Sequence, residues 1–227
     1  MRWKNADLGI VHPTDFIPLA EEIGIISSIG EWVLTEACSK AKIFSKICRE
    51  PLRISVNISS KQFEDDNFVN IVSRVLAETK LPPYQLELEI TESVSLHKIE
   101  KVVLKLNALK EMGISISIDD FGTGYSSISY LKYLPVDTLK IEKSFVQNML
   151  NNTKDRALVE SVISLAKSFG FNVIAEGVET SEQLVLLKTL ECSQAQGYLF
   201  SKPLPLKELY LLFEEKRKNI QIIESVS

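Results

Sequence analysis

The adjacent carboxylates Asp119 and Asp120 are the residues of this chain with the clearest potential for chemistry. They end an alternating apolar run that begins at Ile114, and a glycine-containing loop, residues 121–124, follows directly. Two neighbouring carboxylates repel one another, so a positive group is expected to stabilise them. A pair of hard divalent cations is the natural candidate. The sequence therefore predicts a metal site here, which needs further oxygen ligands from elsewhere in the chain.

Several other polar residues fall at or near the ends of strand-like runs. They are Asn57, Glu89, Glu92, Lys140, Glu176, Glu179 and Gln196. Carboxylates together with an amide oxygen form a ligand set for Mg²⁺ or Mn²⁺ rather than for zinc. Two such ions can activate a water and stabilise the phosphoryl oxygens of an in-line displacement. A nearby lysine can orient that water or screen developing charge. The pattern therefore indicates metal-dependent phosphodiester hydrolysis.

Strand-like and helical segments alternate along the chain, at roughly 30 residues per unit. The six strand-like runs are Arg53–Ile58, Leu86–Ile90, Ile114–Ile118, Thr138–Glu142, Asn172–Ala175 and Gln196–Phe200. Helical spacing appears at Lys98–Met112 and again from Leu158 to Phe169. Gly113 and Gly170 are placed to end these two helices, and Thr180 with Gln183 forms a capping box for the next. This rhythm predicts an α/β barrel, with an open doubly wound sheet as the alternative.

Residue parity within the strands favours the barrel. Apolar residues alternate with polar ones in four of the runs, as in Glu87 and Glu89, Ser117 and Asp119, and Lys140. The apolar faces of parallel strands pack against covering helices, so the polar faces must share one interior. A barrel lumen explains this pattern better than an open sheet, whose two faces would both be apolar.

Composition excludes several classes of protein. The chain has 227 residues, 45% of them hydrophobic, and a formal net charge of −4, which argues against binding a nucleic-acid polymer. Its three cysteines show no metal-ligand spacing, and no apolar run is long enough for a membrane span. We expect one domain in a cytoplasmic protein, with any membrane anchor of the parent protein in upstream regions.

Seven strings, in this order, resemble the EAL-domain family of bacterial cyclic di-GMP phosphodiesterases. They are FIPLAEE, SVNISS, LELEITES, DDFGTGYSS, LKIEKSF, VIAEGVET and QGYLFSKPLP. The resemblance covers residues 2–206, so the chain is expected to be a partial EAL domain over 1–227, with a C-terminal helix and tail at 207–227. It implies a modified TIM barrel with one strand reversed. It also implies a hydrolase in second-messenger signal transduction, which opens cyclic di-GMP to linear pGpG with two Mg²⁺ or Mn²⁺ ions.

The resemblance also implies roles for individual residues. Asn57, Glu89 and Asp119 would be metal ligands, Asp119 bridging the two ions, and Asp120 would serve the second ion. Lys140 would hold the attacking water, and Glu176 would act there as ligand or base. Gln196 would help to hold the substrate site.

Further roles lie around this centre. Glu92 resembles the glutamate that anchors the DDFGTG loop, and the loop at Asp120–Ser127 resembles a dimerisation-linked loop, which implies a possible homodimer. Arg2 resembles an arginine that contacts substrate phosphate, and Pro18 and Leu19 lie where the family contacts a guanine base. Glu179 is either a substrate-binding residue or a helix-capping residue.

The chain departs from the family pattern at its beginning. The Glu-Ala-Leu motif that should precede Arg2-Trp3 is absent, and with it a metal-binding glutamate. Only about six of eight strand units are present, so we expect an N-terminally truncated barrel with two exposed edges. Family members often carry GGDEF or sensory domains upstream. Glu142 replaces the usual aspartate of the KID motif, which should matter little unless it moves Lys140.

Three alternatives to an active phosphodiesterase stay open. The first is a non-catalytic receptor for cyclic di-GMP or a protein-interaction module, which the missing glutamate favours. The second is a hydrolase acting on another phosphodiester, and the third is a purely structural barrel. Four residues also have structural explanations: Glu87 as an ion-paired lumen residue, Trp3 and Trp32 as core residues, and Leu19 as a helix-packing residue. The segment Glu214–Lys218 is expected to be a solvated helix end.

Overall fold

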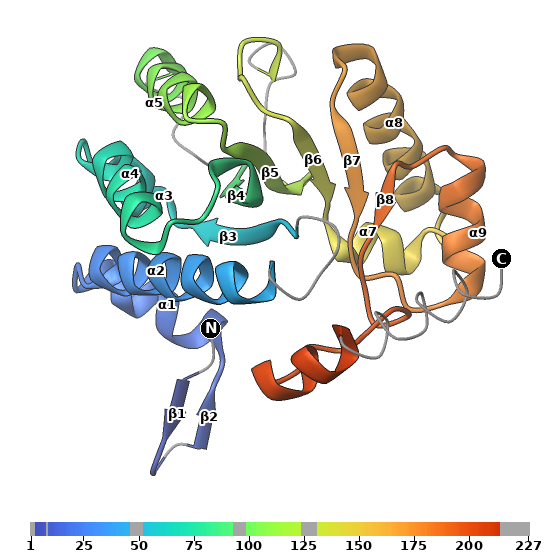
Figure 1. Cartoon of the computed structure of the whole chain (residues 1–227). Helices are drawn as coiled ribbons and strands as arrows, with labels where there is room; N and C mark the ends of the chain where they lie inside the picture. Colours follow the sequence, from blue (N-terminus) through green and yellow to red (C-terminus); the bar gives the residue numbers. More distant parts are fainter. Residues whose placement is uncertain (1–2, 8, 46–51, 93–98, 124–130, 214–227) are drawn as a thin grey trace, which may run out of the picture.

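The structure is a computed structural model of the whole chain and describes residues 3–7, 9–45, 52–92, 99–123 and 131–213 (Figure 1). Predictions for Arg2, for residues 124–127 of the dimerisation-linked loop and for the tail from Glu214 lie outside these ranges. No helix within the ranges combines the length and the apolar character that crossing a membrane requires.

Six parallel strands form a single sheet in which every strand pairs with its neighbours in chain order (Figure 1). They are β3 (Ile54–Ile58), β4 (Leu86–Thr91), β5 (Ser115–Phe121), β6 (Thr138–Ile141), β7 (Asn172–Ala175) and β8 (Gln194–Ala195). A short antiparallel hairpin, β1 (Trp3–Asn5) and β2 (Gly9–Val11), precedes them. The α/β class, the parallel order and the first five strands are confirmed.

The sixth strand was predicted at Gln196–Phe200, and this is wrong. The strand lies at Gln194–Ala195, and residues 198–200 form a turn. In this turn the amide of Phe200 donates to the carbonyl of Gly197 at 3.1 Å. A side chain at Gly197 would place its Cβ 2.1 Å from the Val178 carbonyl oxygen, so only glycine fits there. The three consecutive apolar residues that follow, at 198–200, therefore look like part of a strand in the sequence but form a turn.

Helices surround the outer side of the sheet (Figure 1). They are α1 (Pro13–Glu22), α2 (Ile26–Phe44), α3 (Ser60–Glu64), α4 (Phe68–Thr79), α5 (Ile99–Glu111), α7 (Lys143–Asn148), α8 (Thr153–Phe169), α9 (Ser181–Thr189) and a last one at residues 206–213, with a 3₁₀ turn at Pro83–Gln85. The predicted stop at Gly170 is confirmed, since its φ of 76° is left-handed. The capping box of Thr180 and Gln183 is confirmed at the start of α9.

The central strands are buried on both faces. Their apolar residues, including Leu88, Ile116 and Leu139, form the core with the covering helices. The alternate residues are polar and are buried as well: Glu87, Glu89, Ser117, Thr138 and Lys140. The predicted polar interior is therefore confirmed for β4, β5 and β6. The outer strands differ, because Ser55 and Asn57 on β3 and Gln194 on β8 are exposed.

Candidate active site

Three carboxylates converge on one buried ammonium group in the polar interior. The Nζ atom of Lys140 lies 2.8 Å from Glu89 Oε2, 2.9 Å from Asp119 Oδ1 and 2.7 Å from Glu176 Oε1. The side chain of Lys140 is only 4% exposed. When all four groups are ionised the cluster carries a net charge of −2, which attracts cations strongly in a low-dielectric interior.

Strand register brings these four residues together. Glu89 on β4 pairs with Ser117 on β5, and Asp119 follows two residues later on the same face. Lys140 projects from β6. Glu176 is the first residue after β7, and its amide donates to the carbonyl of Ile141 at 3.2 Å. The cluster therefore lies where four adjacent parallel strands end, at the carboxyl-terminal edge where barrel enzymes place their chemistry.

Burial and charge act against each other in this cluster. Burial raises the pKa of Glu89 and of Glu176, and attraction to Lys140 opposes this increase without cancelling it. Burial alone would lower the pKa of Lys140, but the charges of Glu89, Glu176 and Asp119 outweigh it and raise the value well above the ordinary range for lysine. Lys140 is thus held firmly in its charged form as the counter-ion of the three acids.

The donor set fits a hard divalent cation. Carboxylate oxygens are the ligands that Mg²⁺ and Mn²⁺ prefer. Asp119 Oδ1 is buried and, although it lies close to Lys140, receives no well-aligned hydrogen bond; the buried hydroxyl of Ser117 on the same face also lacks one. Within the described residues, no group of three or more potential ligands is arranged as a metal centre. The Lys140 ammonium takes the point on which the oxygens converge, so a metal ion would need small side-chain movements.

Glu92, the first residue after β4, and Asp120, near the end of β5, lie beside the cluster. Glu92 Oε2 accepts a hydrogen bond of 3.0 Å from the amide of Gly122. Asp120 has a left-handed φ of 53°, which aspartate tolerates better than most residues. Partial burial raises the pKa of the Asp120 carboxyl, and the negative charges of Asp119 and Glu142 raise it further. The loop thus begins with a strained turn that Glu92 holds.

Other predicted residues lie away from Lys140. Asn57 pairs in register with Glu89 but is exposed, because β3 is an outer strand. Gln196 directly follows β8, the opposite outer strand, and is also exposed. Glu179 accepts a hydrogen bond of 2.9 Å from Gln147 Nε2, while Thr180 is the N-cap of α9. The side-chain cap of α9 is thus Thr180, with Glu179 directly before it, and the choice between substrate binding and helix capping for Glu179 stays a prediction.

The sequence analysis did not identify the ion-pair partner of Glu87. Glu87 was expected to be ion-paired, and its partner is Arg53, at 3.2 Å between Nη1 and Oε2. The strand register could have indicated this partner, because Ser55 pairs with Glu87 and Arg53 lies two residues before Ser55, directly before β3. Glu142 caps α7 by accepting from the amide of Ser144 at 2.8 Å, and Lys140 keeps its three contacts.

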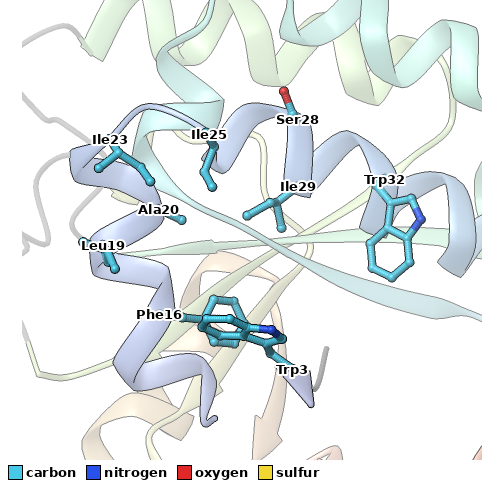
Figure 2. Close-up of a pocket in the computed structure, with 9 residues that line it drawn as sticks. All are labelled: Trp3, Phe16, Leu19, Ala20, Ile23, Ile25, Ser28, Ile29 and Trp32. Carbon is cyan, nitrogen blue, oxygen red and sulfur yellow. The ribbon is translucent and has the colours of Figure 1, made fainter. Parts of the chain in front are cut away.

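The two tryptophans are not core residues, contrary to the prediction. Trp3 is 42% exposed and Trp32 is 58% exposed. Figure 2 shows both at the margin of an apolar hollow between α1 and α2. Leu19, expected to serve helix packing or base contact, lines the same hollow and is also exposed. Pro18 lies inside α1, one residue before it.

Comparison with known proteins identifies the family. The profile of the EAL domain matches residues 1–203. The chain belongs to the EAL-domain family. It is 39% identical over 209 residues, 92% of its length, to the bifunctional diguanylate cyclase/cyclic di-GMP phosphodiesterase MucR of Pseudomonas aeruginosa, and equally similar to the cyclic di-GMP phosphodiesterase NbdA of that organism. It covers only 30% and 27% of these two relatives, so it corresponds to a fraction of their length.

Solved EAL-domain structures share the fold. The phosphodiesterase of MucR in complex with c-di-GMP superposes with a TM-score of 0.88 at 39% identity, covering 92% of this chain and 84% of that one. The EAL domain of DcpA from Mycobacterium smegmatis gives a TM-score of 0.77 at 41% identity, covering 82% of this chain and 84% of that one. The six parallel strands therefore correspond to the TIM-like barrel of EAL domains.

Proposed function

We propose that this chain carries the catalytic centre of a cyclic di-GMP phosphodiesterase, which hydrolyses the cyclic dinucleotide to linear pGpG with two Mg²⁺ or Mn²⁺ ions. The observation that supports this most strongly is the convergence of Glu89, Asp119 and Glu176 on Lys140. Family membership and about 40% identity to phosphodiesterases add support.

The family resemblance suggests a role for each of these residues. Glu89 and Asp119 would hold the metal ions, with Asp120 and Asn57 contributing from the loop and from β3. The ions would supply an activated water and neutralise the phosphoryl oxygens. Lys140 would orient the attacking water, and Glu176 would accept its proton. Gln196 and Glu179, with Arg2, Pro18 and Leu19, would contact the substrate, and Glu92 would hold the loop.

The test is turnover of cyclic di-GMP by this chain with Mg²⁺ and with Mn²⁺, followed as pGpG on a column. Asp119→Asn removes one charge from the cluster with little change in shape, so turnover should fall at least 100-fold, as on loss of a metal ligand or of its support. Asp155→Asn, at a partly exposed position in the first turn of α8, is the matched control and should keep full activity. Near-normal turnover by Asp119→Asn would refute the assignment.

A second candidate function is a receptor that binds cyclic di-GMP without cleaving it. The exposure of Asn57 on β3 and of Gln196 just after β8 favours it, because neither side chain joins the Lys140 cluster. Saturable binding of cyclic di-GMP with no pGpG, by the chain and by a version extended to include the Glu-Ala-Leu motif, would establish the receptor. Turnover by the extended version alone would instead mark this chain as an incomplete enzyme.

A further inference from the structure

Gln183 is a buried polar residue to which the proposed function gives no role. It is the third residue of α9 and is only 4% exposed. Burying an amide side chain is costly unless both its oxygen and its nitrogen find hydrogen-bond partners. Gln183 finds these partners on two different elements, and each of these elements adjoins a member of the Lys140 cluster.

The oxygen of this side chain holds the loop of residues 176–180, which joins β7 to α9 and which we call the Glu176 loop. Gln183 Oε1 accepts from the amide of Glu179 at 2.7 Å and from the amide of Thr180 at 3.0 Å. The bond from Thr180 belongs to the capping box of α9, whereas the bond from Glu179 lies outside it. Gln183 therefore does more than cap the helix, because it also fixes the loop that precedes it.

The nitrogen of the same side chain reaches α7. Gln183 Nε2 donates to the carbonyl oxygens of Val146 and Gln147, each at 3.4 Å. Both carbonyls lie near the end of α7, where the last carbonyl groups of a helix have no partner within it. The N-cap of α7 is Glu142, two residues after Lys140 on the same chain segment. The side chain thus connects the Glu176 loop to the helix that follows Lys140.

Two further contacts hold the Glu176 loop against α7. Gln147 Nε2 donates to Glu179 Oε1 at 2.9 Å. Gly177 packs so closely on Lys143 that a Cβ atom at Gly177 would lie 2.7 Å from the Lys143 Cβ. The φ of Gly177 is 69°, in the left-handed region that favours glycine. The loop and α7 are therefore in intimate contact, and Gln183 bonds to the backbone of both.

The position of this loop determines where the Glu176 carboxylate lies. Glu176 is the first residue of the loop, and its Oε1 atom lies 2.7 Å from Lys140 Nζ. A displacement of about 1 Å at a reacting group can cost roughly 100-fold in rate. A loop that moves away from α7 would shift Glu176 relative to Lys140, since α7 and Lys140 belong to the same chain segment.

We propose that Gln183 is a positioning residue, which clamps the Glu176 loop to α7 and so holds Glu176 in place beside Lys140. The clamp itself rests on hydrogen bonds and close packing. Its effect on turnover rests on the proposed function, in which Glu176 accepts the proton of the attacking water. Gln183 acts through the loop and does not contact the reacting atoms.

Two substitutions of Gln183 in the full chain separate clamping from helix capping. Gln183→Glu keeps an acceptor for the amides of Glu179 and Thr180, but its carboxylate cannot donate to α7. Gln183→Met keeps a similar shape, adds no charge and removes both the acceptor and the donor. In both variants, kcat for cyclic di-GMP should fall at least about 10-fold while KM stays within about 2-fold, because the loss concerns the chemical step rather than binding. The amides of residues 176–179 should also exchange hydrogen faster.

Thr180→Ala is the matched control, because it removes the capping hydroxyl and leaves the Gln183 side chain in place. Its Tm should fall by about 2–4 °C through loss of the cap, with kcat and the exchange of residues 176–179 unchanged. Equal losses of kcat in Thr180→Ala and in Gln183→Glu would overturn the proposal, since weaker capping would then explain both. Parent-like kcat and exchange in Gln183→Glu would also overturn it, because the bonds to α7 would then be dispensable.

Hydrogen exchange distinguishes failure of the clamp from failure of the proposed function. If the parent chain forms no pGpG with Mg²⁺ or Mn²⁺, the phosphodiesterase assignment fails for this chain, and the exchange rates still decide the clamp. Faster exchange confined to residues 176–179 in both Gln183 variants would support it. Exchange as in the parent chain would overturn it, as would exchange that is equally fast throughout α9 and the loop.

Discussion

The interior strands and the outer strands of this sheet carry similar polar residues in very different surroundings. On β4, β5 and β6 the residues Glu89, Ser117 and Lys140 are buried, and the Glu89 carboxylate forms an ion pair with the Lys140 ammonium group. On β3 and β8 the corresponding polar residues, Asn57 and Gln194, face solvent. Residue type alone therefore does not decide whether a polar side chain joins the buried cluster. A strand needs a neighbouring strand on each side before its polar residues are enclosed.

Removal of the central ammonium should have the largest effect on this arrangement. Lys140→Met leaves three buried carboxylates without their counter-ion, so unfolding free energy should fall by about 3–5 kcal/mol, as when one partner of a buried ion pair is lost. Urea unfolding measures the change. Lys154→Met, at an exposed position of α8, should have no measurable effect. Equal stability of the two variants would show that the cluster is hydrated rather than buried.

The same cluster predicts a dependence of stability on pH. The pKa values of Glu89 and Glu176 are raised in the folded chain by burial, so the native state binds more protons than the unfolded state at mildly acidic pH. Stability should therefore decrease as pH rises from about 4.3, the unfolded value, through the raised native values. Urea unfolding in chelator should show this decrease, and Glu89→Gln with Glu176→Gln should remove it. If the double variant keeps the same decrease of unfolding free energy with pH, other groups than Glu89 and Glu176 cause it.

Asp137, at the entrance to β6, should show how tightly the interior strands are joined. Its carboxylate accepts from the buried amide of Ile116 at 2.8 Å and from Lys110 Nζ at 2.5 Å. Asp137→Ala leaves a buried amide without a partner, so unfolding free energy should fall by about 1.5–3 kcal/mol in a urea titration. Asp137→Asn keeps an acceptor for Ile116 and should lose less. Equal losses would contradict the role given to the amide.

Lys105, on α5, connects the interior of the molecule to an outer unit that consists of β3 and α3. Its Nζ donates to the carbonyl oxygens of Phe63, Glu64 and Asp65 at 2.8–2.9 Å, where α3 ends. Lys105→Ala should cost about 1 kcal/mol, because water replaces part of the lost hydrogen bonding. Hydrogen exchange should show faster opening of α3, with β5 unaffected. Uniform loss of protection across the sheet would mean that the outer unit does not open separately.

Substitutions of the outer polar residues should have the smallest effect. Asn57→Ala and Gln196→Ala should each change the unfolding free energy by less than about 0.5 kcal/mol, because both side chains are exposed. Urea unfolding, as for the interior residues, measures the change. A loss greater than 1 kcal/mol would show that these residues are enclosed in solution, as the interior residues are.

The interior of the molecule was predictable from the sequence because strand parity is a local signal. Glu89 and Asp119 occupy polar positions between apolar ones, and glycine and threonine caps delimit the helices that cover them. The family resemblance then added roles that parity alone does not supply. Alternation and motif order together were therefore enough to select the residues that the structure brings together around Lys140, while their roles stay predictions.

The surface was predictable only in part, because exposure depends on which elements lie next to one another. Trp32 looks like a core residue in its helix, yet no described element packs over that face of α2. The turn at residues 198–200 follows from the close approach of Gly197 to Val178, a contact between segments that no local pattern encodes. Both errors arise from contacts between segments far apart in the sequence, which local sequence patterns do not predict.

The central claim is that Glu89, Asp119 and Glu176 form a binding site for divalent cations around Lys140. Titration of Mn²⁺ into the chain, followed by electron paramagnetic resonance, tests this directly without depending on turnover. The account predicts saturable binding by the parent chain that Asp119→Asn weakens at least 10-fold, while Asp155→Asn binds normally. Equal Mn²⁺ affinity in all three proteins would contradict the claim.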